Sequence, residues 1–165
     1  MKQQVNTPVK YAFLMRTETI SIWNSLDFSS VTVTFFIHAT EDQERLLSKI
    51  KIALDIPEEQ LVIENIQGHF GNVITSVKGH FIGEDARKLS LKIFENLAAD
   101  SRNTLISELE KSMDEHDSLY LRIDRQSLDQ GLSLSDEEPI RIKLKPRIRA
   151  GGREAMIKQY AELIR

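Results

Sequence analysis

The sharpest alternation in this chain is IRIKLK at residues 140–145. Apolar side chains occupy every second position, and Arg141, Lys143 and Lys145 occupy the positions between them. Successive side chains of a β-strand point to opposite faces of a sheet, so the pattern predicts a strand with one buried face and one basic face. Neighbouring cations on that face lie roughly 7 Å apart, close to the spacing of phosphates along one nucleic-acid strand.

The rest of the chain supplies partners for this strand. A period of two with β-branched or apolar residues predicts further strands at residues 31–38, 61–68, 73–81 and 119–124, with a short one near 132–134. Apolar stripes at helical spacing predict helices at 40–54, 84–98, 101–113 and 153–164. The long elements follow the order β-α-β-β-α-α-β-β-α, in which strands and helices do not alternate singly. This order predicts an α+β fold with a mostly antiparallel sheet and helices packed on one face.

The predicted domain occupies residues 29–165, and a tight hairpin lies within it. Residues 68–72 read GHFGN between two predicted strands, and Gly71 and Asn72 tolerate the positive φ that a hairpin turn needs. Residues 1–28 keep no clean period, so we expect them to form a partly ordered N-terminal extension.

Composition indicates a cytoplasmic protein without a membrane segment. The chain has no cysteine, which excludes a disulfide framework, a thiolate metal site and a cysteine nucleophile. The longest apolar run near the N-terminus, residues 11–15, is too short for a signal peptide or a spanning helix.

Charge is distributed unevenly along the chain. Residues 139–165 carry eight Lys or Arg and two acids, a net charge of +6, whereas the preceding 138 residues carry fourteen bases and twenty-three acids, a net charge of −9. Such a polarised field favours a polyanion at one place. The candidate phosphate-binding residues are Arg141, Lys143, Lys145, Arg147 and Arg149, supported by Arg122 and Arg125. Two alternatives remain open: a Lys-rich edge strand that blocks aggregation, and a basic strand paired with acidic helices.

Two aromatic residues extend this hypothesis. Phe36 and Tyr120 occupy positions on the polar faces of their predicted strands. If those faces coincide with that of Arg141, the rings would stack on unpaired bases while the cations hold the RNA backbone. Alternatively, Phe36 and Tyr120 pack under the N-terminal extension.

No motif indicates catalysis, a cofactor or a metal. The four histidines show neither i,i+4 pairing nor HExxH spacing, and the glycines at 68–72 lack the Gly-Lys-Ser/Thr ending of a phosphate loop. We therefore expect no catalytic residue, cofactor or metal. Two other functions stay open: an enzyme that uses His69 or His80 with a nearby carboxylate, and a protein–protein or homodimer module that pairs through the basic edge strand.

Three segments resemble a known family. HATED at 38–42, GHFGN at 68–72 and LYLRIDRQ at 119–126 are similar, in that order, to an archaeal family of small proteins described as predicted RNA-binding proteins or exosome subunits. The resemblance covers about residues 30–145. It implies a fold like that of the ribosomal protein that holds 5S RNA, RNA as ligand, and contact with exosome or ribosome components. On the matched motifs it suggests RNA contact for His69, Asn72, Arg122 and Arg125.

Overall fold

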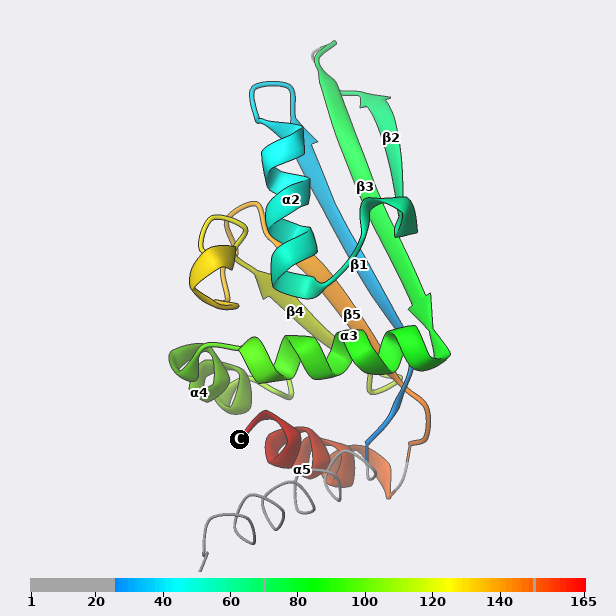
Figure 1. Cartoon of the computed structure of the whole chain (residues 1–165). Coiled ribbons are helices and arrows are strands. Elements are labelled where there is room, and N and C mark those ends of the chain that lie inside the picture. Colours follow the sequence, from blue (N-terminus) through cyan, green and yellow to red (C-terminus); the bar gives the residue numbers. More distant parts are fainter. Residues whose placement is uncertain (1–25, 70, 150) are drawn as a thin grey trace, which may run out of the picture.

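The computed structural model describes residues 26–69, 71–149 and 151–165, which build a five-stranded antiparallel sheet with the strand order β2-β3-β1-β5-β4 (Figure 1). The strands are β1 (Phe28–His38), β2 (Leu61–Gln67), β3 (Val73–Ile82), β4 (Leu119–Ile123) and β5 (Ile140–Pro146). The α-helices are α2 (Gln43–Leu54), α3 (Gly83–Asn96), α4 (Ala99–Ser107) and α5 (Gly152–Ile164). This confirms the predicted α+β class and the order of its long elements. Within the described ranges, no helix is both long and apolar enough to cross a membrane.

Helices α2 and α3 cover one face of the sheet (Figure 1). Beneath them, Val31 and Val33 of β1 and Leu144 of β5 are fully buried, together with Ile50 of α2 and Ile93 of α3. Burial of one such side chain contributes roughly 1.5–3 kcal/mol to folding, so the apolar half of each alternating strand anchors the helices. The buried positions of β1 and β5 are those that the period of two predicted.

The opposite face of the sheet, which we call the open face, holds the polar half of the alternation. Tyr120 and Phe36 keep 42% and 39% of their surface exposed there, and Arg141 and Lys145 are exposed as well. Among the described residues, no helix covers this face, and the open face lies behind the sheet in the view of Figure 1. The predicted packing of helices on one face is therefore confirmed.

Helix α5 closes the end of the sheet where β1 begins. The Phe28 ring stacks on Phe94 of α3 and on Tyr160 of α5, with centroid distances of 6.0 and 6.2 Å. Leu26 and Phe28 are both buried, so the core already includes the last residues of the expected N-terminal extension. Residues 1–25 lie outside the described part of the chain, and so does any packing of Phe36 or Tyr120 beneath them.

Strand β5 is not an edge strand. It pairs with β1 on one side and with β4 on the other, so its backbone hydrogen-bonding groups are already used by the sheet. The alternative of a Lys-rich edge strand is therefore wrong, and so is homodimerisation by edge-to-edge pairing of β5.

Local chemistry shifts three predicted boundaries. Helix α2 begins at Gln43 instead of 40, because the carboxylate of Asp42 accepts the Arg45 N–H at 3.0 Å and caps the helix there. Helix α4 ends at Ser107 instead of 113, since the Ser112 carbonyl accepts the Tyr120 N–H at 2.8 Å and this segment joins β4. The expected short strand at 132–134 is reduced to two isolated bridges.

The predicted hairpin of β2 and β3 is confirmed. The two strands pair from Leu61 opposite Gly79 to Gln67 opposite Val73. Gly71 adopts a φ of +78°, and the Gly68 N–H donates to the Asn72 carbonyl at 2.7 Å. Glycine supplies the left-handed conformation at this turn without steric cost.

Asp117 joins α5 to the β4 end of the sheet and offers a test of the fold. Its side chain is 1% exposed, accepts from Arg149 Nε at 2.6 Å, and lies 3.4 Å from Arg153 Nη1. We expect Asp117→Asn to lower the free energy of unfolding by about 2 kcal/mol, because charge-assisted hydrogen bonds are lost. Asparagine tolerates the φ of +59° at this position, so the substitution tests the charge and not the backbone.

Urea denaturation measures this loss. Asp136→Asn is the control, because Asp136 also pairs with an arginine but its side chain is 84% exposed. We expect that variant to stay within about 1 kcal/mol of the wild type. Equal stability of the two variants would contradict the role assigned to Asp117.

Candidate functional site

The pairing of β1 with two neighbours brings distant cations into one row across the open face. Thr34 lies opposite Lys78 of β3 on one side and opposite Arg141 of β5 on the other. Arg141 in turn lies opposite Arg122 of β4. Three cations that are far apart in the sequence therefore share one row across four strands.

The next row contains an aromatic ring and a cation in contact. Thr32 lies between His80 and Lys143, and Lys143 lies opposite Tyr120. The Lys143 Nζ sits 5.0 Å from the centroid of the Tyr120 ring, a cation–π arrangement. Asp114 organises the pair, since one of its oxygens accepts the Tyr120 hydroxyl at 3.0 Å and lies 3.2 Å from Lys143 Nζ.

Asp114 is held as a carboxylate. Burial alone would raise the pKa of Asp114, but hydrogen bonds from the Ser118 backbone N–H, Lys143 and Tyr120 outweigh this effect. The pKa of Asp114 is thereby lowered from 3.8 to about 2. The Tyr120 oxygen raises the pKa of Lys143; desolvation opposes this rise and Asp114 adds to it. Lys143 is therefore a positioned cation at neutral pH.

Three cations of the open face are not neutralised. In the described ranges, no carboxylate lies within ion-pair distance of Lys78, Arg141 or Lys145, and all three side chains are exposed. Arg122 differs, because its Nη1 lies 2.7 Å from an Asp136 oxygen. That pair is largely exposed, and exposed pairs contribute only about 0–1 kcal/mol, so a phosphate can compete for Arg122.

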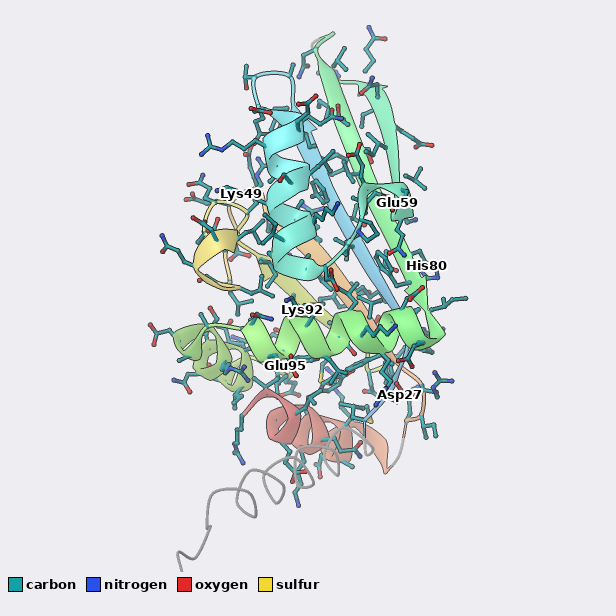
Figure 2. The ribbon with its side chains drawn as sticks, viewed as in Figure 1. Asp27, Lys49, Glu59, His80, Lys92 and Glu95 are labelled. Carbon is teal, nitrogen blue, oxygen red and sulfur yellow. The ribbon has the colours of Figure 1, made fainter. Side chains whose placement is uncertain are left out.

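Two predicted phosphate-binding residues lie at the end of the sheet and have carboxylate partners. Arg147 Nε donates to Asp27 at 2.7 Å, and Figure 2 shows Asp27 beside the loop that follows β5. Arg149 Nε donates to the buried Asp117 at 2.6 Å. Both arginines are engaged in holding the chain at this end, and we leave them out of the site.

Arg125 is also structural. It is 6% exposed, donates to the Phe36 carbonyl at 2.7 Å, and pairs with Glu41 at 3.2 Å and with Glu138. Its guanidinium is thus buried and paired with two carboxylates. We therefore exclude Arg125 from the site, in contrast to the expectation from sequence.

The same cluster contains ligand types that bind metals. His38, Glu41 and Glu138 each offer one ligand atom within 4.8 Å of the others, and His38 Nε2 lies 2.9 Å from Glu138. The Arg125 guanidinium already supplies the positive charge between the two carboxylates. A cation placed there would be repelled by Arg125, so we interpret the cluster as an ion-pair network.

His69 and Asn72 lie at the tip of the β2–β3 hairpin, away from the basic rows. Lys78 is five residues from the start of β3, or about 16 Å along the strand. His80 lies near the opposite end of β3 (Figure 2), so His69 and His80 lie far apart. The site residues predicted from sequence thus fall into an open-face group, a sheet-end group and a hairpin-tip group, and Arg125 is buried apart from all three.

Lys78 is a site residue that the sequence analysis missed. The alternation VITSVKGHFI already placed Lys78 on the polar face of its strand. The sequence does not reveal the register of β3 against β1. This register puts Lys78 opposite Thr34 and in the row of Arg141.

An open antiparallel sheet face with cations and aromatic rings defines a class of nucleic-acid-binding surface, and comparison with known proteins agrees. A family model described as RNA binding matches residues 30–146. The chain belongs to this RNA-binding family. The resemblance to an archaeal RNA-binding family is thereby confirmed.

Two curated relatives are archaeal. The RNA-binding protein PAB1135 of Pyrococcus abyssi is 27% identical over 146 residues, which are 83% of this chain and 94% of that protein. The uncharacterized protein MJ0213 of Methanocaldococcus jannaschii is 29% identical over 105 residues, which are 59% of this chain and 69% of that protein.

Solved structures share the fold. Protein AF2318 from Archaeglobus fulgidus, a DUF54 protein, superposes with a TM-score of 0.69 at 26% identity, over 83% of this chain and 99% of that one. Mth689 from Methanothermobacter thermautotrophicus, also a DUF54 protein, has a TM-score of 0.67 at 22% identity, over 84% and 98% of the two chains.

The low pKa of Asp114 predicts a pH dependence of stability. A carboxylate whose pKa is lower in the folded than in the unfolded chain stabilises the fold above the unfolded value, near 3.8, and loses this effect as pH falls toward 2. We expect the free energy of unfolding to fall more steeply between pH 4 and 2 in the wild type than in Asp114→Asn. Urea denaturation at each pH measures the two slopes.

Tyr120→Phe is an intermediate variant, since it removes one of the hydrogen bonds that Asp114 accepts. Its slope should lie between those of the wild type and Asp114→Asn. Equal slopes in all three proteins would show that Asp114 does not hold Tyr120 and Lys143 as described.

Proposed function

We propose that the open face binds RNA mainly through backbone phosphates, with Lys78, Arg141, Lys143 and Lys145 as the contacting cations. The observation that carries this proposal is that Lys78, Arg141 and Lys145 are exposed and have no carboxylate within ion-pair distance in the described chain, whereas Asp114 positions the fourth cation, Lys143. All four lie on one face of a protein with net charge −3. An acidic protein that keeps such cations together concentrates a polyanion at that face. Membership in the RNA-binding family names RNA as that polyanion.

The arrangement of like charges supports a ligand. Arg122 and Arg141 lie directly opposite each other on neighbouring strands, and like charges in this position destabilise a sheet. Asp136 offsets this cost only on the Arg122 side. A phosphate placed between the two guanidinium groups would relieve the remaining repulsion.

We further propose that the protein is a non-catalytic accessory of RNA processing or ribosome maturation in the cytoplasm, and that it meets exosome or ribosome components there. Phosphate contacts hold and orient RNA without reading its sequence, which suits an accessory that acts on many transcripts. We also propose that the fold is like that of the ribosomal protein that holds 5S RNA, as the family resemblance implies, and such a fold would suit this role.

Salt dependence tests the phosphate contacts. Neutralising about four phosphates of a single-stranded RNA gives a slope near −2.8 in a plot of log affinity against log salt concentration. We expect the double variant Arg141→Gln, Lys145→Gln to bind RNA more weakly and to reduce the slope to about −1.4, because two contacts are lost.

The matched control is Lys51→Gln, Lys88→Gln, which removes two exposed cations from α2 and α3, the helices that cover the other face. It changes net charge equally and should retain the wild-type slope. Equal slopes for the two double variants would contradict the assignment of the open face. Absence of RNA binding by the wild type at about 50 mM salt would overturn the proposed function itself.

A further inference from the structure

The open face contains a hollow beside its basic rows. Its volume is about 450 Å³, within the range of small-molecule sites in proteins. Phe36 of β1 lines it, with Ile66 of β2 and Ile74 of β3 on one side and Pro139 and Arg141 on the other. The hollow is therefore mostly apolar, and it opens beside a cation that has no carboxylate partner in the described chain.

We propose that this hollow receives a single unpaired nucleobase of the bound RNA, which stacks on the Phe36 ring while its phosphate contacts Arg141. This inference rests on the proposed function and adds to it a preference for unpaired nucleotides. Aromatic rings on open sheet faces bind flat bases by stacking, and this contact tolerates any base.

The polar groups around the hollow support a ligand of this kind. Asp136 and Glu138 lie at its rim, but Asp136 is paired with Arg122, and Glu138 is paired with His38 and Arg125. Each of these carboxylates therefore already has a partner within the protein, although Glu138 shares Arg125 with Glu41, whereas Arg141 has no carboxylate partner in the described chain. A flat apolar group joined to an anion, which is the chemistry of a nucleotide, matches an apolar hollow with one free cation at its edge.

The hollow lies directly beside the row of cations on the open face. Phe36 follows Thr34 by two residues on the same face of β1, and Thr34 lies between Lys78 and Arg141. An RNA strand whose phosphates follow those cations therefore passes the mouth of the hollow. A duplex cannot fill it without unpairing a base, which costs a few kcal/mol.

Binding of single-stranded RNA that carries one 2-aminopurine, compared with a blunt-ended, fully paired duplex of equal phosphate count, tests the inference in the full chain. We expect Phe36→Ala to weaken binding of the single strand roughly tenfold or more, with little change for the duplex. The 2-aminopurine fluorescence should be quenched by the wild type and much less by this variant. Phe36→Trp should restore both affinity and quenching, which a merely structural role of Phe36 would not predict.

Ile52→Ala is the matched control, since Ile52 is 75% exposed on α2, away from the open face, and should bind as the wild type does. Thermal unfolding establishes that Phe36→Ala is folded. Wild-type binding of single strands by folded Phe36→Ala would overturn the base site and leave phosphate binding intact. Competition by an aromatic peptide, without quenching of 2-aminopurine, would also overturn it and assign the hollow to a protein partner. Failure of the wild type to bind any RNA at low salt would overturn the proposed function as well.

Discussion

Antiparallel pairing of β1 with both β3 and β5 is the interaction on which the rest of the structure depends. Because β1 is the central strand, its register decides which side chains of the neighbouring strands share a row. The apolar side chains of these strands pack against α2 and α3, and the side chains at the alternate positions form the open face. Thr34 illustrates the consequence, since it has no charge itself but places Lys78 and Arg141 on either side of it. One set of backbone hydrogen bonds thus builds the core and the candidate RNA surface together.

The basic residues of this chain form two groups: those that pair with a carboxylate and those that do not. Arg149 meets the buried Asp117 at the end of the sheet, and Arg125 meets two glutamates beneath Phe36, so both stabilise the fold. Arg141 and Lys145 project from the open face, where no carboxylate of the described chain lies within ion-pair distance of them. Only some of the basic residues in the sequence therefore remain without a carboxylate partner once the chain has folded. In our proposal that smaller set contacts the RNA phosphates, and the hollow beside Phe36 adds an apolar feature to the same face.

Much of the secondary structure could be predicted because it depends on local periodicity. The alternation at 140–145 and 31–38 predicted two strands, and GHFGN at 68–72 predicted the hairpin, since glycine adopts the positive φ of its turn at low cost. Predictions failed where a distant contact competed with local preference. Helix α4 ends before its expected last residues because the carbonyl of Ser112 accepts the N–H of Tyr120 in β4. The site was predicted only in part. Arg141, Lys143 and Lys145 share a face as expected, but Arg125 is buried and Lys78 was overlooked.

The sequence by itself determined which side chains of each strand face water, because alternation is a property of consecutive residues. It also determined the excess of positive charge in the last quarter of the chain. Tertiary structure alone decided that β5 is an inner strand, that Lys78 joins the row of Arg141, and which arginines are neutralised. The physical reason is that strand order and register arise from packing between segments far apart in the chain, and ion pairing follows from distances that only this packing sets.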